Sequence, residues 1–234
     1  MQTFFDDLRW LNAGKPRILI YPQELRSTEW FSIYRRNSYN LSFNFYQTIN
    51  RRVSLGIYPG IAYQHGLLST PFHRVYFTDD SERVENPPQQ RLKIPIGAQL
   101  NMFLGKMWIV RTYYRFYWDD FGIAAHTLNV ETPVKISQKF TVSPFIRLYT
   151  QSGTNYFKPY AEHELSQQFY TSDYDLSDFE SAKAGISVRF TPFGGRTCSL
   201  HELEFRYSRY KRSDGLQAHT ITAFINLKGE REKK

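Results

Sequence analysis

The sequence predicts an all-β protein, an antiparallel up-and-down β-barrel that crosses a membrane. Apolar and polar residues alternate in one segment after another, which is the period of a strand and not of a helix. Each segment is about 11–14 residues long, and a tilted strand needs about 9–11 to cross a bilayer. Short and longer connections follow each other in turn, as they do at the two ends of an outer-membrane barrel.

Nine segments carry this alternation: 39–49, 54–64, 91–104, 107–118, 124–136, 139–151, 181–193, 199–211 and 216–228. In a membrane barrel the apolar side chains of these strands face lipid, and the alternation alone does not distinguish this from a soluble barrel with an apolar interior. The residues expected to face lipid include Leu92, Ile94, Ile96, Val110, Phe116, Val142 and Ile146.

Connection lengths and aromatic positions favour the membrane arrangement. The connections 50–53, 105–106, 137–138 and 194–198 are short, and they alternate with 65–90, 119–123, 152–180 and 212–215. Of the second set, 65–90 and 152–180 are long and polar. Aromatic residues near strand ends are expected to form the girdles seen at membrane interfaces. They are Tyr58, Tyr63, Trp108, Tyr117, Trp118, Phe140, Phe190, Phe193 and Phe224.

Nine strands conflict with the even number found in bacterial single-chain barrels. The segment 16–23 or the segment 28–36 is a candidate tenth strand. Residues 1–14 show no secretory signal, so missing upstream strands would explain both observations. We therefore expect an incomplete, carboxyl-terminal portion of a barrel with about 9–10 strands present. Residues 1–37 form an irregular segment with one possible strand, 38–228 the barrel and 229–234 a charged tail.

Composition excludes several other classes of protein. Among the 234 residues no apolar run reaches the roughly 18 that a membrane helix needs. The net charge of +8 is spread along the chain without a nucleic-acid recognition motif, so no nucleic acid partner is expected. Cys198 is the only cysteine, which excludes an internal disulfide and a cysteine metal cluster. No cofactor is expected.

The polar positions opposite the apolar stripe are the candidate functional residues. In a barrel they converge on the lumen. An excess of arginine and tyrosine there would bind or pass anions. The alternative is a plugged interior in which Arg–Glu pairs and tyrosine hydroxyls only hold the wall together. The candidate lumen-lining residues are Lys93, Gln99, Arg111, Tyr113, Arg115, Arg147, Tyr149, Lys183, Arg189, Glu204 and Arg206.

Several segments resemble a known family. YYRFYWDDFGIAAHTL (113–128) is typical of it, with a tyrosine/arginine strand, Asp119, a turn at Gly122 and a following strand with His126. Together with 38–52, 65–77, 145–157 and 170–179, it is similar to the domain-of-unknown-function family 3570. The resemblance covers about residues 35–228 and implies a Gram-negative outer-membrane β-barrel without an established activity. The tail 228–234 departs from barrels that end on an aromatic residue.

Motifs for catalysis or metal binding are weak. His65 and His73 bracket a loop, but histidines at such junctions are mostly hydrogen-bonding residues. No Gly-x-Ser-x-Gly, Walker A or zincin spacing is present. The acidic, aromatic segment 156–180 is expected to bind a cation or a partner surface at the cell exterior, or to form a solvated lid over the mouth of the lumen.

The expected function is non-enzymatic: binding or passage of a small, anionic solute in the outer membrane, or an envelope scaffold with protein partners. The alternatives are a soluble β-barrel that holds an apolar ligand inside, and a barrel lipid hydrolase assembled across strands. The soluble alternative places Leu92, Ile94 and Ile96 in the interior.

Overall fold

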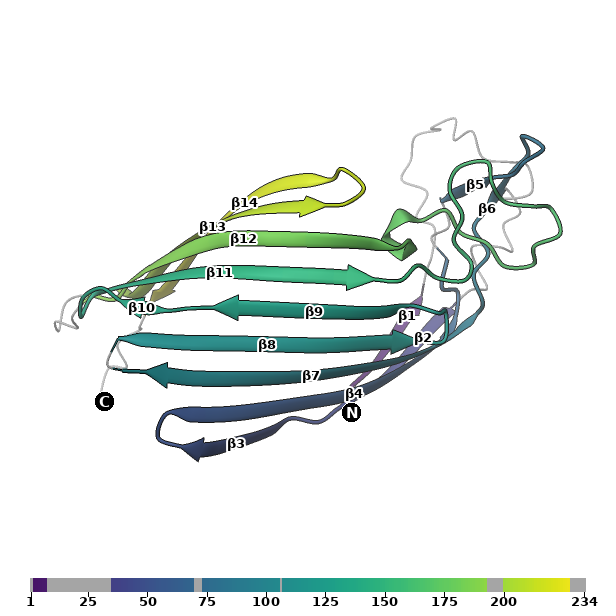
Figure 1. Ribbon diagram of the computed structural model, residues 1–234. Coiled ribbons are helices and arrows are strands. Elements are labelled where there is room, and N and C mark those ends of the chain that lie inside the picture. The colour runs from purple at the N-terminus through teal and green to yellow at the C-terminus, as the bar shows by residue number, and fades with distance from the viewer. Residues whose placement is uncertain (1, 8–34, 70–72, 106, 193–199, 228–234) are drawn as a thin grey trace, which may run out of the picture.

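The computed structural model describes residues 2–7, 35–69, 73–105, 107–192 and 200–227, and they form one large antiparallel sheet with a small hairpin at one end (Figure 1). The strands of the sheet are β1 (Gln2–Asp7), β2 (Arg35–Ser42), β3 (Phe45–Asn50), β4 (Val53–Gly66), β7 (Gln90–Leu104), β8 (Trp108–Asp119), β9 (Ala124–Glu131), β10 (Val134–Lys135), β11 (Phe140–Gln151), β12 (Phe179–Phe190), β13 (Leu200–Arg212) and β14 (Gln217–Leu227). The hairpin is β5 (Arg74–Tyr76) and β6 (Glu82–Val84), and a single 3₁₀ turn spans Tyr174–Leu176. The described residues include no helix long and apolar enough to cross a membrane.

The prediction of an all-β, antiparallel, up-and-down fold is confirmed. Strands follow each other across the sheet in chain order, and every pairing within it is antiparallel. All nine predicted segments contribute to this sheet. Sequence periodicity predicted them well because each strand keeps one apolar and one polar face along its length.

Two predicted strands are interrupted, and a proline accounts for each break. The segment 39–49 is divided into β2 and β3, and Pro59 of β4 lies opposite the gap. The segment 124–136 is divided into β9 and β10 on either side of Pro133. Proline has no N–H to donate to a neighbouring strand, so the ladder is lost locally. The two halves occupy one strand position in each case.

Among the described residues the tenth strand position is β1. Residues 16–23 and 28–34 lie outside the described residues, and Arg35 and Arg36 begin β2, ahead of the predicted barrel start at 38. Within the described residues β1 pairs only with β2 and β14 only with β13, so the sheet is open between them. The tail 229–234, Phe193 and Cys198 also lie outside the described residues.

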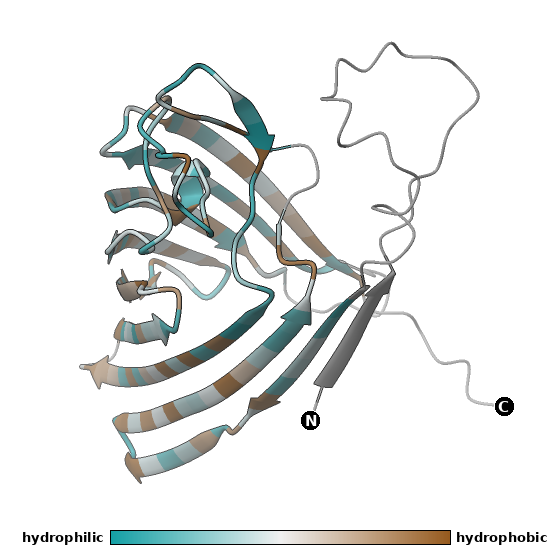
Figure 2. Ribbon diagram, turned by 90° about the vertical axis from the view of Figure 1, so that its right-hand side faces the viewer, coloured by the Kyte–Doolittle hydropathy of each residue, from teal (hydrophilic) through white to brown (hydrophobic). Residues whose placement is uncertain are grey.

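The sheet curves into a trough with one concave and one convex face (Figure 2). Side chains from strands that are not neighbours meet on the concave face. Tyr58 of β4 contacts Tyr113 of β8 across β7, with ring centroids 6.3 Å apart. Arg206 of β13 reaches Glu131 of β9 across β12 and β11. Curvature of the sheet brings such side chains closer together.

Large apolar side chains cover the convex face and are exposed. Ile96 and Ile146 are each 44% exposed, and Phe205 is 53% exposed. A soluble sheet normally buries such a face against a second layer. Here no second layer of the described chain covers it, and the predicted lipid-facing residues all lie on this side.

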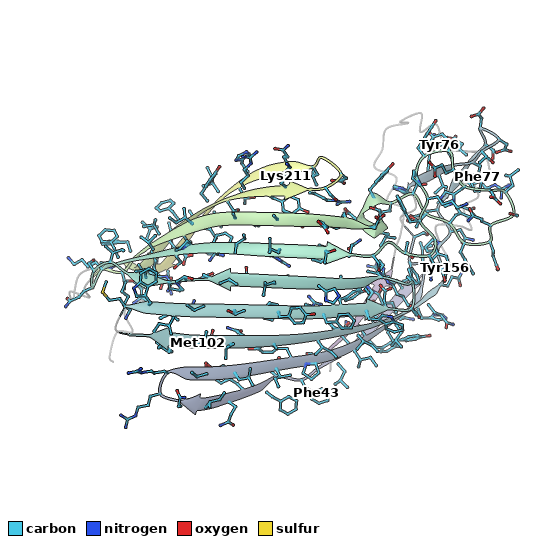
Figure 3. All side chains as sticks on the ribbon, viewed as in Figure 1. Phe43, Tyr76, Phe77, Met102, Tyr156 and Lys211 are labelled. Carbon is cyan, nitrogen blue, oxygen red and sulfur yellow. The ribbon has the colours of Figure 1, made fainter. Side chains whose placement is uncertain are left out.

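The two long connections pack together at one end of the sheet, as their alternation with short ones predicted. The hairpin β5–β6 lies against residues 152–178, and Val75, Phe77 and Tyr170 form a small buried core there (Figure 3). His163 and Thr171 are buried beside it. We call this end the cap and the opposite end, with the connections at 51–52, 105–107 and 136–139, the turn end.

Candidate site on the concave face

The eleven residues predicted to line a lumen share the concave face. Their registers show this directly, since Gln99 pairs with Tyr113, Arg147 with Lys183, and Arg189 with Glu204. Residues at paired positions point to the same side of a sheet. The structure divides them into an ion-paired group near the turn end, an unpaired cationic group in the middle, and a group next to the cap.

Near the turn end a chain of ion pairs crosses five strands. Glu131 of β9 accepts from Arg206 at 3.0 Å and lies 3.5 Å from Arg111. Arg189 donates to Glu204 at 3.0 Å, and Arg206 also stacks on the Phe145 ring at 4.6 Å. These pairs neutralise most of the charge in this layer. Glu131 was missed in the sequence analysis, because the break at Pro133 obscured the alternation around it.

Asp119 organises the end of β8 next to the cap. Its carboxylate is fully buried and accepts from Arg91 Nη2 at 2.5 Å and from the Tyr117 hydroxyl at 2.7 Å. The other carboxylate oxygen accepts from the backbone N–H groups of Phe121 and Ile123, both at 3.1 Å. Lys93 pairs with Asp119 in the register. The arrangement fixes the turn rather than presenting a reactive group.

A second contact, between the buried Arg212 and the exposed Asp175, ties the cap to the concave face. The guanidinium of Arg212, at the end of β13, donates to the Asp175 carboxylate at 2.6 Å. Gln151 of β11 donates to the Asp175 carbonyl at 3.0 Å. Asp175 belongs to the acidic segment that was predicted to bind a cation or a partner, or to act as a lid. The Asp175 carboxylate pairs with Arg212, while the Asp175 side chain itself stays exposed.

The middle of the concave face has a different character. Arg115, Arg147 and Lys183 form no ion pair with any described residue. A hollow of about 290 Å³ opens beside two of them. It is lined by Arg147, Tyr149, Phe179, Ser181, Lys183 and Tyr210.

A larger hollow, of about 500 Å³, lies over the convex face. Tyr114, Leu128, Leu148, Ala182 and Lys211 form one row across five strands there. The small Ala182 leaves a shallow groove between its larger neighbours, and the floor is apolar. The convex groove is as apolar as the surface around it, so nothing marks it as a specific site. The concave hollow contains two charged side chains, and we therefore place the functional site there.

The aromatic residues predicted to form girdles are divided between the two faces of the sheet. Tyr63, Trp108, Trp118, Phe140 and Phe190 lie on the convex face near strand ends. Tyr58, Tyr117 and Phe224 do not, because their registers place them on the concave face. Position near a strand end was too weak a criterion, because it ignores which face of the sheet each residue points to.

Histidines and acidic residues show little sign of metal chemistry. No group of three or more His, Cys, Asp or Glu residues in the described part of the chain is placed to hold a metal ion. His126 and His219 each contact a tyrosine hydroxyl, and His163 contacts Gln167 and the Thr171 carbonyl. His65 lies at the end of β4 and His73 in the cap connection, and we find no shared ligand set for them.

The comparisons with known proteins give one result. The sequence profile of a family described as "Protein of unknown function (DUF3570)" matches residues 21–233. The chain belongs to this family. No curated protein matches the sequence.

The residues that carried the resemblance to DUF3570 turn out to be structural. Asp119 holds the end of β8, and Gly122 adopts φ +94° in the turn that follows. A backbone φ of this value favours glycine, and a Cβ there would also displace the Asn155 side chain, from which it would lie 2.7 Å away. His126 is on the convex face and contacts Tyr114 at 2.7 Å. The motif therefore marks a strand–turn–strand unit of the fold.

Proposed function

We propose that this DUF3570 chain forms the wall of an outer-membrane β-barrel of a Gram-negative bacterium, with a lumen that binds or passes a small solute without catalysis. One observation carries the proposal. From β4 to β12 the convex positions hold no Asp, Glu, Lys or Arg except Glu180, which is next to the cap, and on β13 the charged convex positions are Arg209 and Lys211, in the half of the strand nearest the cap. Charges are expensive next to hydrocarbon, and an uncharged exposed face of this extent is what a lipid-facing wall needs.

The dimensions of the convex face support the same proposal. Trp108 and Trp118 lie at the two ends of the convex face of β8. Ten residues of strand span about 33 Å, and a tilt of about 40° reduces this to roughly 25 Å along the membrane normal. That height equals the apolar band of outer-membrane barrels, with aromatic residues at both boundaries.

The even number of strand positions also agrees with a closed barrel. The sheet has ten strand positions among the described residues, counting β2 with β3 and β9 with β10 as one each. An even number makes β1 and β14 antiparallel, as closure across them requires. An open edge in lipid would leave backbone groups unpaired at a cost of several kcal/mol each, so the proposal includes closure.

A soluble barrel with an apolar ligand inside is not favoured. It requires Leu92, Ile94 and Ile96 to point into the interior, but their registers place them on the convex face, opposite Lys93 and Arg91. The concave face instead carries arginines, tyrosines and carboxylates, which suit a polar solute.

Two variants test the membrane wall, and both place an arginine in the middle part of a long strand. Ile146→Arg places a charge on the convex face and should cost about 2–4 kcal/mol if that position lies near the bilayer midplane. Gln99→Arg adds the same charge on the concave face and should insert normally. Insertion is measured by flotation with phospholipid vesicles and by heat-modifiable migration on gels. Equal insertion of both variants, or wild-type protein that stays soluble without detergent, would contradict the proposal.

Passage is tested in planar bilayers with the wild-type protein. A solute-conducting lumen gives discrete ion currents with an anion-selective reversal potential, because the unpaired charges in the middle layer are positive. Correctly inserted protein that carries no current would refute passage and leave the envelope scaffold as the function of the wall.

A further inference from the structure

We infer that the middle of the concave face is a binding site for a small oxyanion, a carboxylate or phosphate, held by Arg147 and Lys183, with Arg115 adding positive charge from the adjacent row. The inference rests on the proposed function, because it names the class of solute that the polar wall takes. It draws on three features of the site: the register of the cations, their lack of counter-charges, and the hollow beside them.

The register brings the cations together on neighbouring strands. Arg147 of β11 and Lys183 of β12 are directly opposite each other, and Tyr210 of β13 is the next residue in that row. Arg115 belongs to the adjacent row towards the cap, which continues through Thr127 to Tyr149. Side chains directly opposite in an antiparallel pair have Cβ atoms about 4.5–5.5 Å apart, so the two cationic heads can reach a common ligand.

The absence of counter-charges distinguishes these residues from the other concave arginines. Arg91, Arg111, Arg189, Arg206 and Arg212 each pair with a carboxylate. Arg115, Arg147 and Lys183 pair with none among the described residues, and no carboxylate lines the hollow. Like charges opposite each other destabilise a sheet. A bound anion removes that repulsion, whereas a purely structural role gives no reason to place them together.

The hollow matches a small ligand. Its volume of about 290 Å³ equals roughly ten water molecules of the liquid, which suits a phosphate or a short organic acid. The planar guanidinium of Arg147 is suited to bidentate contact with a carboxylate or phosphate, and Lys183 adds a point charge. Ser181 and Tyr210 supply hydroxyl groups, and Phe179, whose ring centroid is 5.4 Å from that of Tyr149, forms an apolar side.

The test is calorimetric titration of citrate, and separately of inorganic phosphate, into protein folded in an uncharged detergent at low salt. Wild-type protein should bind citrate with a dissociation constant of about 1 mM or tighter, and added sodium chloride should weaken binding. The double variant Arg147→Gln, Lys183→Gln should weaken it at least tenfold. Lys211→Gln is the matched control: it removes a cation from the convex face, opposite Ala182, and should bind as wild type does.

A second readout keeps the inference falsifiable. Without ligand, Lys183→Gln should move the unfolding midpoint to a higher denaturant concentration, because it relieves repulsion from Arg147. A residue with a structural role would shift the midpoint the other way, and that result would overturn the inference. Folded wild-type protein that binds neither probe, or a double variant that binds as tightly as wild type, would also overturn it.

The binding and current measurements together separate failure of the site from failure of the proposed membrane function. Binding in detergent without bilayer currents refutes passage and supports the site. Currents that neither citrate nor phosphate reduces, together with no calorimetric binding, overturn the site and leave the barrel proposal intact.

Discussion

Replacing Asp119 by alanine tests how the end of β8 is held. The carboxylate is fully buried and accepts hydrogen bonds from Arg91, from the Tyr117 hydroxyl and from two backbone N–H groups. Its removal leaves Arg91, whose side chain is only 15% exposed, without its partner. Breaking a buried ion pair from one side costs about 3–5 kcal/mol. We expect Asp119→Ala to lose stability in this range.

Asp119→Asn separates the charged contact from the backbone hydrogen bonds. The amide oxygen still accepts from the N–H groups of Phe121 and Ile123. The amide NH2 that replaces the other oxygen cannot accept from Arg91 or from the Tyr117 hydroxyl. The loss of stability should be smaller, about 1.5–3 kcal/mol. The assay is denaturant unfolding in detergent micelles or lipid vesicles, followed by tryptophan fluorescence, since Trp118 is the adjacent residue.

Asp120→Ala is the control, because the Asp120 side chain is exposed and its backbone bond to Leu92 is retained. A change within about 0.5 kcal/mol is expected for a surface position of this kind. The reasoning would be refuted if Asp119→Ala were no less stable than Asp120→Ala.

Two further predictions concern the wall and the cap. Gly185→Ala should destabilise the sheet by about 1–3 kcal/mol, since a Cβ would lie 2.3 Å from the Tyr207 carbonyl and 2.7 Å from the Phe145 ring. Gly97→Ala meets only the mobile end of Tyr113 and should cost less in the same unfolding assay; an equal cost would contradict this account. His163→Ala removes two contacts of a buried ring, to Gln167 and to the Thr171 carbonyl. At about 0.5–1.5 kcal/mol each, their loss should speed tryptic cleavage after the exposed Arg83 of β6 in the cap about tenfold while the strands stay protected. Cleavage at the wild-type rate would show that His163 does not hold the cap, and His126→Ala on the convex face is the control.

The sequence by itself determined the strands and the two faces of the sheet. Alternation with a period of two is a local property, so Ile94 and Ile96 could be assigned to one face and Arg111 and Arg147 to the other without knowledge of the neighbours. Connection lengths likewise predicted that the two long connections lie at the same end. Two kinds of prediction failed. Glu131 was missed because Pro133 interrupts the alternation next to it, and Tyr58 was assigned to a girdle although its position in the alternation places it on the concave face.

Only the tertiary structure decided which charges neutralise each other. Arg206 and Glu131 are far apart in the sequence and belong to strands that are not neighbours, and curvature of the sheet brings them together. The same curvature leaves Arg147 and Lys183 opposite each other without a carboxylate. Ion pairing depends on three-dimensional distance, and no pattern in the sequence distinguishes a paired arginine from an unpaired one on the same face.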